Sequence, residues 1–155
     1  GSWCFLATII TTAPLAPDSP LTNRCGSCRA CIEACPTHAI TEEQTMDARR
    51  CISYHSIENR DEIPEDIADK MGDCLFGCDI CQSVCPWNQN KKCEDAASPT
   101  HPEFAALDPA MLTTLSDEDF HRLFDGTPVT RAKAKGIRRN ASLFLRNHII
   151  PPDDS

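Results

Sequence analysis

The sequence predicts an α+β protein in which a cysteine-rich module is followed by a helical tail. Two observations predict the module: four cysteines within 25–36, "CGSCRACIEACP", and a shorter repeat of that pattern at 78–86, "CDICQSVCP". A third observation predicts the tail, because the cysteines stop after Cys93 and helical patterns follow. We therefore expect the module to span 25–95 and the tail to span 96–155.

Residues 1–24 are expected to be the end of a further domain that precedes the module. They begin with a short apolar run of strand character, from Cys4 to Ile10, and continue into the proline-containing loop 11–23. A chain that starts directly in such a run is typical of a piece of a longer protein. No charged leader opens the sequence, and no segment approaches the length of a membrane span.

Short helices are expected between and after the cysteines. The stretch 29–35, "RACIEAC", predicts a short helix between ligands. The stretch 47–60 predicts a strand or turn that runs into a helix. The stretch 63–73 predicts a helix with Pro64 in its first turn and Gly72 at its end.

The tail carries two signals for the start of a helix. Ser116 followed by Asp119 resembles a capping box, which would begin a helix that runs through Phe120. Thr127 and Pro128 then offer a cap and a first-turn proline for the segment that follows. The sequence thus predicts one helix after Ser116 and another after Thr127.

The cysteine spacing distinguishes among three kinds of chemistry. Disulfides require an oxidising compartment, and nothing in the sequence indicates secretion. Structural zinc commonly uses pairs of cysteines separated by two residues. The first cysteine group instead has successive gaps of two, two and three residues and ends in Pro36, which is the spacing of bacterial ferredoxins. The sequence therefore predicts a ferredoxin-like module with two 4Fe-4S clusters, with zinc or disulfides as the alternatives.

In the ferredoxin pattern the first three cysteines bind one cluster and the fourth binds the other. The second cysteine group supplies three of the four further ligands, and the last must be Cys51 or Cys74. Cys74 lies only four residues before Cys78, whereas Cys51 stands alone between the two groups, and we assign Cys51. We predict that the first cluster is bound by Cys25, Cys28, Cys31 and Cys85, and the second cluster by Cys35, Cys51, Cys78 and Cys81. We expect free thiols at the remaining cysteines, Cys4, Cys74 and Cys93.

Basic residues are concentrated in one segment of an acidic chain. The net charge is −8, yet residues 131–147 hold six Arg and Lys and no acid, which leaves −14 on the rest. In a helical pattern Arg131, Lys135 and Arg138 would share one face. Such a face can bind nucleic-acid phosphates, or it can be a solvated face that balances an acidic protein.

Several stretches of the chain, in one order, closely resemble the C-terminal half of epoxyqueuosine reductases. They are "GSWCFL", "CGSCRACIEACPTHAI", "DARRCISYHSIE", "IPEDI", "FGCDICQSVCPWNQ" and "TPVTRAKAKGIRRNASLFLRN". The resemblance covers nearly the whole chain and is weakest at 91–115. The eight predicted ligands fall at the family's intervals, and Cys74 does not belong to that set. Cys4 stands where the family usually has an aromatic residue.

The resemblance implies a cobalamin-binding α/β domain, a ferredoxin-like insert and a helical-repeat (HEAT-like) tail. This chain would hold the end of the first and most of the rest. The implied reaction reduces epoxyqueuosine to queuosine in the anticodon loop of tRNA. Electrons would pass from an external low-potential donor through the two 4Fe-4S clusters to cobalamin. We expect a cytoplasmic monomer, and we predict no catalytic residue here because the family's general acid lies in the other half.

The resemblance also implies contacts to the cofactor and the substrate. Ser53 and the Cys78–Asp79 peptide are expected to contact cobalamin, although a turn hydroxyl at Ser53 and a helix-capping carboxylate at Asp79 are the plainer alternatives. Asn140 is expected to bond the backbone between helices. Contacts to tRNA phosphates are expected from Arg131, Lys133, Lys135, Arg138 and Arg139.

Two other functions fit part of the pattern. A stand-alone two-cluster electron carrier would not need the long extension after Cys93. The iron–sulfur part of another corrinoid-dependent reductase, such as a reductive dehalogenase, would share the paired cysteine groups. A small organohalide would not explain the basic stretch "RAKAKGIRRN", whereas tRNA would.

Overall fold

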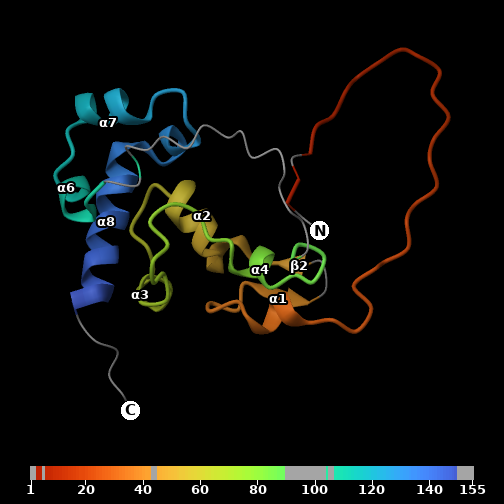
Figure 1. The fold of residues 1–155 in the computed structure, drawn as a ribbon, viewed down its shortest axis with the longest axis horizontal. Helices are drawn as coiled ribbons and strands as arrows, with labels where there is room; N and C mark the ends of the chain where they lie inside the picture. The colour runs from red at the N-terminus through yellow and green to blue at the C-terminus, as the bar shows by residue number, and fades with distance from the viewer. Residues whose placement is uncertain (1–2, 5, 43–44, 90–103, 105–106, 150–155) are drawn as a thin grey trace.

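The computed structural model describes residues 3–4, 6–42, 45–89, 104 and 107–149. In Figure 1 the short helices and the small hairpin of the cysteine-rich module lie beside the helices of the tail. Helices make up most of the regular structure of the described residues, which also contain one two-stranded sheet. The α+β content expected from the sequence is therefore confirmed.

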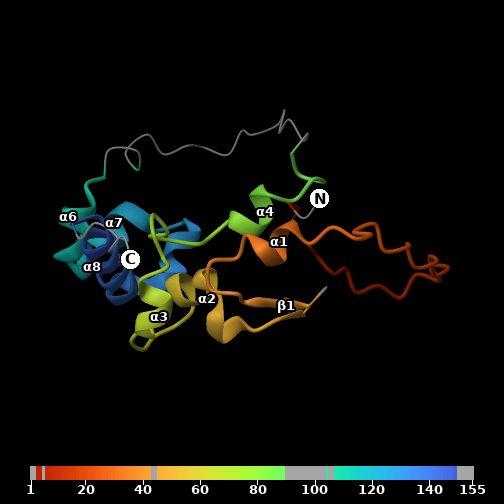
Figure 2. The same cartoon turned by 90° about the horizontal axis from the view of Figure 1, so that it is seen from below.

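The module is built from very short elements. Its helices are α1 (Ala30–Glu33), η1 (Ala48–Arg50), α2 (Ile52–Ile57), α3 (Glu65–Ala68) and α4 (Ile80–Ser83), and its strands are β1 (Ile40–Glu42) and β2 (Thr45–Met46). The strands pair antiparallel, with Ile40 opposite Met46. Figure 2 shows α1 packed beside α4 on one side of the hairpin. The helix expected between ligands at 29–35 and the turn that runs into a helix at 47–60 are confirmed.

The helix expected over 63–73 is shorter than the sequence suggests. Pro64 is its N-cap rather than a residue of its first turn, and the α-helix ends at Ala68. The chain then continues in tighter turns, because the amide of Met71 bonds the Ala68 carbonyl three residues back. Gly72, with φ at +49°, ends the segment in the left-handed region, as expected of a glycine after a helix.

The tail contains four described helical elements: α6 (Pro109–Thr113), α7 (Asp117–Phe124), η2 (Pro128–Ala132) and α8 (Lys133–Ile149). The Ser116 hydroxyl accepts the Asp119 amide at 3.0 Å, so the predicted cap is confirmed. The Thr127 hydroxyl caps η2, not a long α-helix, and Lys133 at φ +61° separates η2 from α8. Arg131 therefore lies outside α8, and the face predicted for Arg131, Lys135 and Arg138 is wrong.

Two apolar clusters stabilise the chain and join the module to the tail. The tail cluster is centred on Phe120, Phe124 and Ile137, and Leu75 and Phe76 of the module pack against it. The module cluster comprises Ile52, Ile63, Ile67, Ala68 and Met71, and it is contacted by Leu143 of α8. Because each cluster receives side chains from the other part, the two parts form one packed unit.

The opening apolar run does not form the expected strand. Residues 6–10 have no helix or strand assigned, and the exposed fraction is 93% for Leu6 and 96% for Ile10. A strand is stable only when another strand completes its hydrogen bonds, and no described segment pairs with this one. Among the described residues, no helix has both the length and the hydrophobicity of a membrane span.

Candidate metal centre and basic helix

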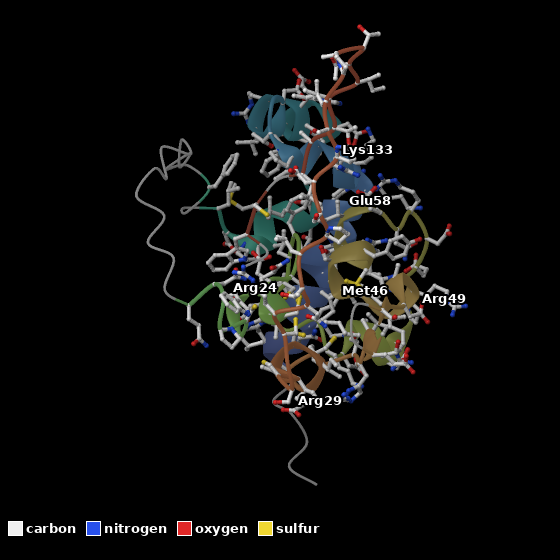
Figure 3. All side chains as sticks on the ribbon, turned by 90° about the vertical axis from the view of Figure 1, so that its right-hand side faces the viewer. Arg24, Arg29, Met46, Arg49, Glu58 and Lys133 are labelled. Carbon is white, nitrogen blue, oxygen red and sulfur yellow. The ribbon has the colours of Figure 1, made fainter. Side chains whose placement is uncertain are left out.

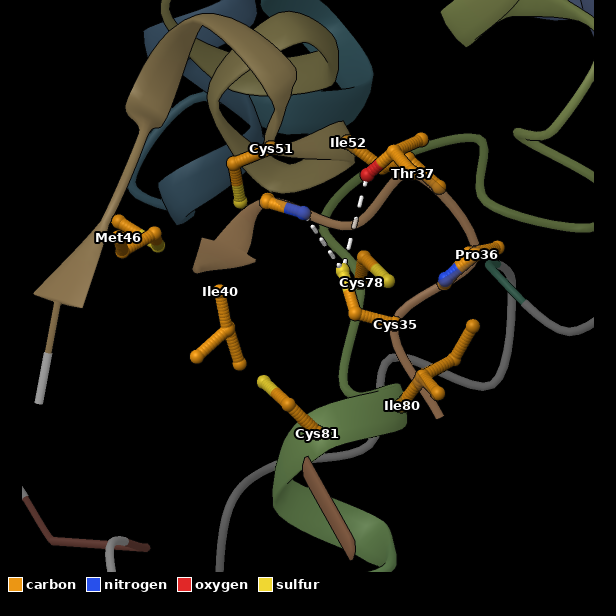
Figure 4. Close-up of a pocket in the computed structure, with 11 residues that line it drawn as sticks. Cys35, Pro36, Thr37, Ile40, Met46, Cys51, Ile52, Cys78, Ile80 and Cys81 are labelled. Atoms are coloured by element: carbon orange, nitrogen blue, oxygen red, sulfur yellow. Dashed lines mark hydrogen bonds between the residues drawn. The ribbon is translucent and has the colours of Figure 1, made fainter. Parts of the chain in front are cut away.

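Four cysteines from distant parts of the sequence line one small cavity beside the hairpin. The cavity has a volume of about 40 Å³. In Figure 4 the four side chains surround the space between the hairpin and α4. These residues are the four ligands predicted for the second cluster, Cys35, Cys51, Cys78 and Cys81.

Different elements supply the four thiols. Cys35 directly follows Ala34, the C-cap of α1, and Cys51 is the N-cap of α2. Cys78 lies two residues before α4, and Cys81 lies within it. Three of the cysteines thus lie at or beside the ends of short helices and the fourth lies within one, which directs thiols from separate segments toward one cavity.

The rest of the cavity wall is almost entirely apolar. Side chains from the hairpin, α2 and α4 cover it, with Ile40, Met46, Ile52 and Ile80 as the largest. Thiolates are soft ligands that favour iron–sulfur clusters, and an apolar wall keeps water away from such a group. The donor set and its surroundings therefore fit a 4Fe-4S cluster.

The sulfur of Cys35 receives hydrogen bonds from the turn that follows it. The Ala39 amide donates to it at 3.3 Å, and the Thr37 hydroxyl oxygen lies 3.6 Å away. Burial raises the pKa of Cys35, but the Thr37 hydroxyl and nearby backbone amides outweigh it and bring the pKa below its usual value. The thiolate, which is the metal-binding form, is therefore favoured at this position.

The remaining thiols of the cavity influence one another. Burial raises the pKa of Cys81, and the negative charges of Cys78, Cys51 and Cys35 raise it further. Cys74 hydrogen-bonds to Cys78, which lowers the pKa of Cys78 to about 6 and raises that of Cys74. Cys74 does not line the cavity, whereas Cys51 does.

The residues predicted for the first cluster are more open to solvent. Cys25 and Cys28 are exposed, and Cys31 and Cys85 are half-buried. Cys31 lies in α1 and Cys85 follows α4, and these two helices pack against each other. The Trp87 indole donates to the carbonyl of Arg24, labelled in Figure 3, at 3.3 Å, which ties the segment after Cys85 to the residue before Cys25.

The described thiols are neither paired with one another nor gathered around one point. All ten described cysteines are free. Within the described part of the chain, no three His, Cys, Asp or Glu side chains are close enough to hold one metal ion. Four thiolates around a cluster each bind a different iron, so they lie farther apart than four thiolates around one zinc ion. The arrangement of cysteines therefore fits a cluster better than zinc.

Arg139, predicted to contact tRNA, is instead directed into the protein. Its guanidinium donates to the carbonyls of His55, Asn59 and Asp61 at 2.6–3.0 Å, and to the Asn140 side chain at 3.0 and 3.2 Å. These bonds use all five donors of an arginine. Arg139 has no donor left for a phosphate, and the expectation of a phosphate contact there is not supported.

The other side chains predicted to contact tRNA differ in their exposure and in the partners that they already bind. Arg138 donates to the Leu115 carbonyl at 2.6 Å and to the Asp117 carboxylate at 2.9 Å. Arg131 is exposed but paired with Glu58, which Figure 3 labels near Lys133. Lys133 and Lys135 are exposed and line a surface cavity of about 260 Å³. The exposed cations of this segment are therefore Arg131, Lys133 and Lys135.

Asn140 bonds the backbone between helices, and this prediction is confirmed. It is 1% exposed and donates to the carbonyls of Ser56 and Leu75 at 2.8 and 2.9 Å. The Ser56 hydroxyl in turn accepts the amide of Gly77, next to Cys78. A single amide of α8 thus links the helix that starts at a predicted ligand to the loop that carries another.

The residues expected to contact cobalamin lie near the second-cluster cavity. Ser53 is half-buried in α2, and its carbonyl accepts the Ser56 hydroxyl at 3.2 Å. Asp79 is exposed at the N-cap of α4, but its side chain makes no capping hydrogen bond. The capping alternative for Asp79 is therefore wrong.

Comparison with known families agrees with the cysteine arrangement. Residues 24–88 match the family model described as a 4Fe-4S double cluster binding domain. The match spans the eight predicted cluster ligands, and it shows an iron–sulfur domain.

Curated relatives extend the similarity to nearly the whole chain. The chain is 42% identical to an epoxyqueuosine reductase of Cellulophaga algicola over 148 residues, which cover 94% of this chain and 48% of that protein. It is 43% identical to an epoxyqueuosine reductase of Gloeobacter violaceus over 152 residues, covering 94% of this chain and 47% of that protein. The chain therefore spans about half the length of the curated relatives it matches.

Solved structures show that the fold is shared. An epoxyqueuosine reductase from Bacillus subtilis superposes with a TM-score of 0.79 at 35% identity, covering 86% of this chain and 36% of that one. An epoxyqueuosine reductase solved with an epoxyqueuosine-modified stem loop of tRNA-Tyr gives a TM-score of 0.77 at 35% identity, with the same coverage. The sequence and the fold together identify the chain as a relative of the epoxyqueuosine reductases.

Proposed function

We propose that the chain is the electron-relay and tRNA-binding part of an epoxyqueuosine reductase, which reduces epoxyqueuosine to queuosine in tRNA. The observation that carries the proposal is the cavity in which Cys35, Cys51, Cys78 and Cys81 meet. Its four thiols fit one cluster, and the match of residues 24–88 to a double-cluster domain supports a second. The relatives that share the pattern are named for this reaction.

In this proposal the chain's own residues hold and shield the electron carriers. The thiolates of the eight predicted ligands bind two 4Fe-4S clusters, which supply one-electron transfer when bound. The second cluster would be surrounded by the apolar side chains of Ile40, Met46, Ile52 and Ile80. The first cluster, with Cys25 and Cys28 exposed, is the more accessible to an external low-potential donor.

The proposal also includes cobalamin and tRNA. In the complete protein an α/β domain would bind cobalamin beside the second cluster, with Ser53 and the Cys78–Asp79 peptide in contact with it. The exposed position of Asp79 and its lack of a capping bond support this placement. Phosphates of the tRNA would bind Arg131, Lys133 and Lys135, on a tail of HEAT-like helices in a cytoplasmic enzyme.

The test uses the complete protein, purified without oxygen and supplied with cobalamin and a strong reductant. It is incubated with tRNA that contains epoxyqueuosine, and queuosine is measured by mass spectrometry of the digested nucleosides. We expect conversion by the wild type, none by Cys51→Ala, and conversion by Cys74→Ala, the matched control outside the cavity. No conversion by wild-type protein with both clusters and cobalamin bound would contradict the proposal and favour another corrinoid-dependent reductase.

A further inference from the structure

One buried hydroxyl lies against a sulfur of the second-cluster cavity. Thr37 is fully buried, and its hydroxyl oxygen lies 3.6 Å from the sulfur of Cys35, as the dashed line in Figure 4 shows. The backbone around it is fixed at both ends. Arg50 donates to the Thr37 carbonyl at 2.8 Å, and the His38 amide donates to the Cys35 carbonyl at 3.1 Å. The hydroxyl is therefore held beside this sulfur by the fold of the turn.

The direction of this hydrogen bond follows from the chemistry of the ligand. A cysteine that binds iron is a thiolate and has no proton to donate. The Thr37 hydroxyl has both a proton and lone pairs, so it must be the donor when the cluster is bound. A donor to a ligand sulfur withdraws negative charge from the cluster, which stabilises its reduced form more than its oxidised form.

The corresponding position of the other cysteine group is different. Thr37 lies two residues after Cys35 in "CPT", and Trp87 lies two residues after Cys85 in "CPW". Trp87 has no hydroxyl, it is 46% exposed, and its indole donates to the carbonyl of Arg24. The repeat therefore supplies a hydroxyl to one cluster at a position where the other has an indole directed elsewhere.

We propose that the Thr37 hydroxyl, by donating to the sulfur of Cys35, makes the second cluster easier to reduce than the first and so sets the direction of electron flow. An electron delivered near the exposed ligands Cys25 and Cys28 would then be held preferentially by the cluster that Cys35 binds. The inference rests on the cluster assignment of the proposed function. Thr37 acts through Cys35 and is a positioning residue, not a catalytic one.

The test is a redox titration of the complete protein without oxygen, followed by electron paramagnetic resonance. The signal of the second cluster is identified by its loss in Cys51→Ala. Thr37→Val removes the hydroxyl with little change in shape. It should lower the ratio in which one electron is distributed between the second and the first cluster about tenfold, which corresponds to a drop of about 59 mV in the potential of the second cluster. Thr37→Ser, which restores a hydroxyl, should return the potential toward that of the wild type.

The converse change gives a second measurement that does not depend on a buried substitution. Trp87→Thr places a hydroxyl at the more exposed equivalent position and should raise the potential of the first cluster. If Thr37→Val folds with both clusters at unchanged potentials, or if it fails to fold and Trp87→Thr leaves the first cluster unchanged, the inference is overturned and the proposed function stands. Wild-type protein that binds fewer than two clusters would instead overturn the proposed function.

Discussion

The cysteine cavity and helix α8 both gather reactive or charged side chains, but they direct them oppositely. In the cavity four thiols face a common space whose other walls are almost entirely apolar. In α8 Arg139 instead turns inward and binds three backbone carbonyls of the module. The difference teaches that a run of charge along a helix predicts a binding surface less well than a spacing of ligands, because arginine also serves as an internal hydrogen-bond donor.

The largest effect that separates the two regions is expected from removing iron. Chelation under oxidising conditions should remove the two proposed clusters, which join the segments 25–42 and 78–89. Hydrogen exchange of these segments should become faster by about tenfold or more, while α2 and α8 keep their protection. Mass-resolved exchange of the holo and stripped proteins measures this. Equal loss of protection in α8 would show that the packing of the tail against the module also depends on the clusters.

A smaller but still large effect is expected when the inward arginine is removed. Arg139→Met leaves the carbonyls of His55, Asn59 and Asp61 without their donor, and the free energy of unfolding should fall by about 3 kcal/mol. Denaturant unfolding of the complete protein measures the change. Lys135→Gln, an exposed change on the same helix, should alter stability by less than about 0.5 kcal/mol. Similar values for the two variants would contradict the structural role of Arg139.

The exposed lysines should show the opposite behaviour. The double variant Lys133→Gln with Lys135→Gln should keep its stability but bind tRNA more weakly, because two cations beside a surface cavity are lost. The slope of log affinity against log salt should fall by about 1 for each lost phosphate contact. Fluorescence anisotropy at several salt concentrations measures the slope. Arg122→Gln on α7 is the control. An equal loss of tRNA affinity in that variant would show that net charge, and not the position of the two lysines, weakens binding.

The smallest expected effect is a pH dependence at the end of α8. The Phe144 carbonyl and the Asp73 carboxylate, which lies 2.6 Å from the ring, raise the pKa of His148. The stabilisation should therefore be complete below the unfolded pKa of about 6.5 and be lost as pH rises through the higher folded pKa. In His148→Gln the thermal midpoint of unfolding should depend less on pH over that range. A wild-type midpoint that rises with pH relative to the variant would have the wrong sign.

The cysteine arrangement was the part of the site that the sequence predicted best. A 4Fe-4S cluster imposes fixed intervals on its ligands, so the gaps after Cys25 and Cys78 carry geometric information. The role of Asn140 was also predicted correctly, because its side chain donates to backbone carbonyls of two other segments. Local caps such as Ser116 are visible in sequence because partner and donor are only three residues apart.

The features that the sequence did not reveal depend on contacts between distant segments. Thr37 is an exception, because its hydroxyl contacts the sulfur of Cys35 from only two residues away. The carbonyls that bind Arg139 belong to residues about 80 positions earlier in the chain. The run at 6–10 has strand character but no described partner. A short hydroxyl two residues after a cluster cysteine is the one signal that could have indicated Thr37.

The hydrogen bonds of Asn140 also bear on when, during synthesis, the cysteines can bind iron. This side chain ties the carbonyls of Ser56 and Leu75 together, and it belongs to the helix that leaves the ribosome after every predicted ligand. During synthesis the cysteines at 25–85 are therefore present before the helix that links the segments carrying Cys51 and Cys78. We expect iron loading to follow synthesis of α8, so that the nascent chain passes through an interval in which its thiols are bare and open to oxidation.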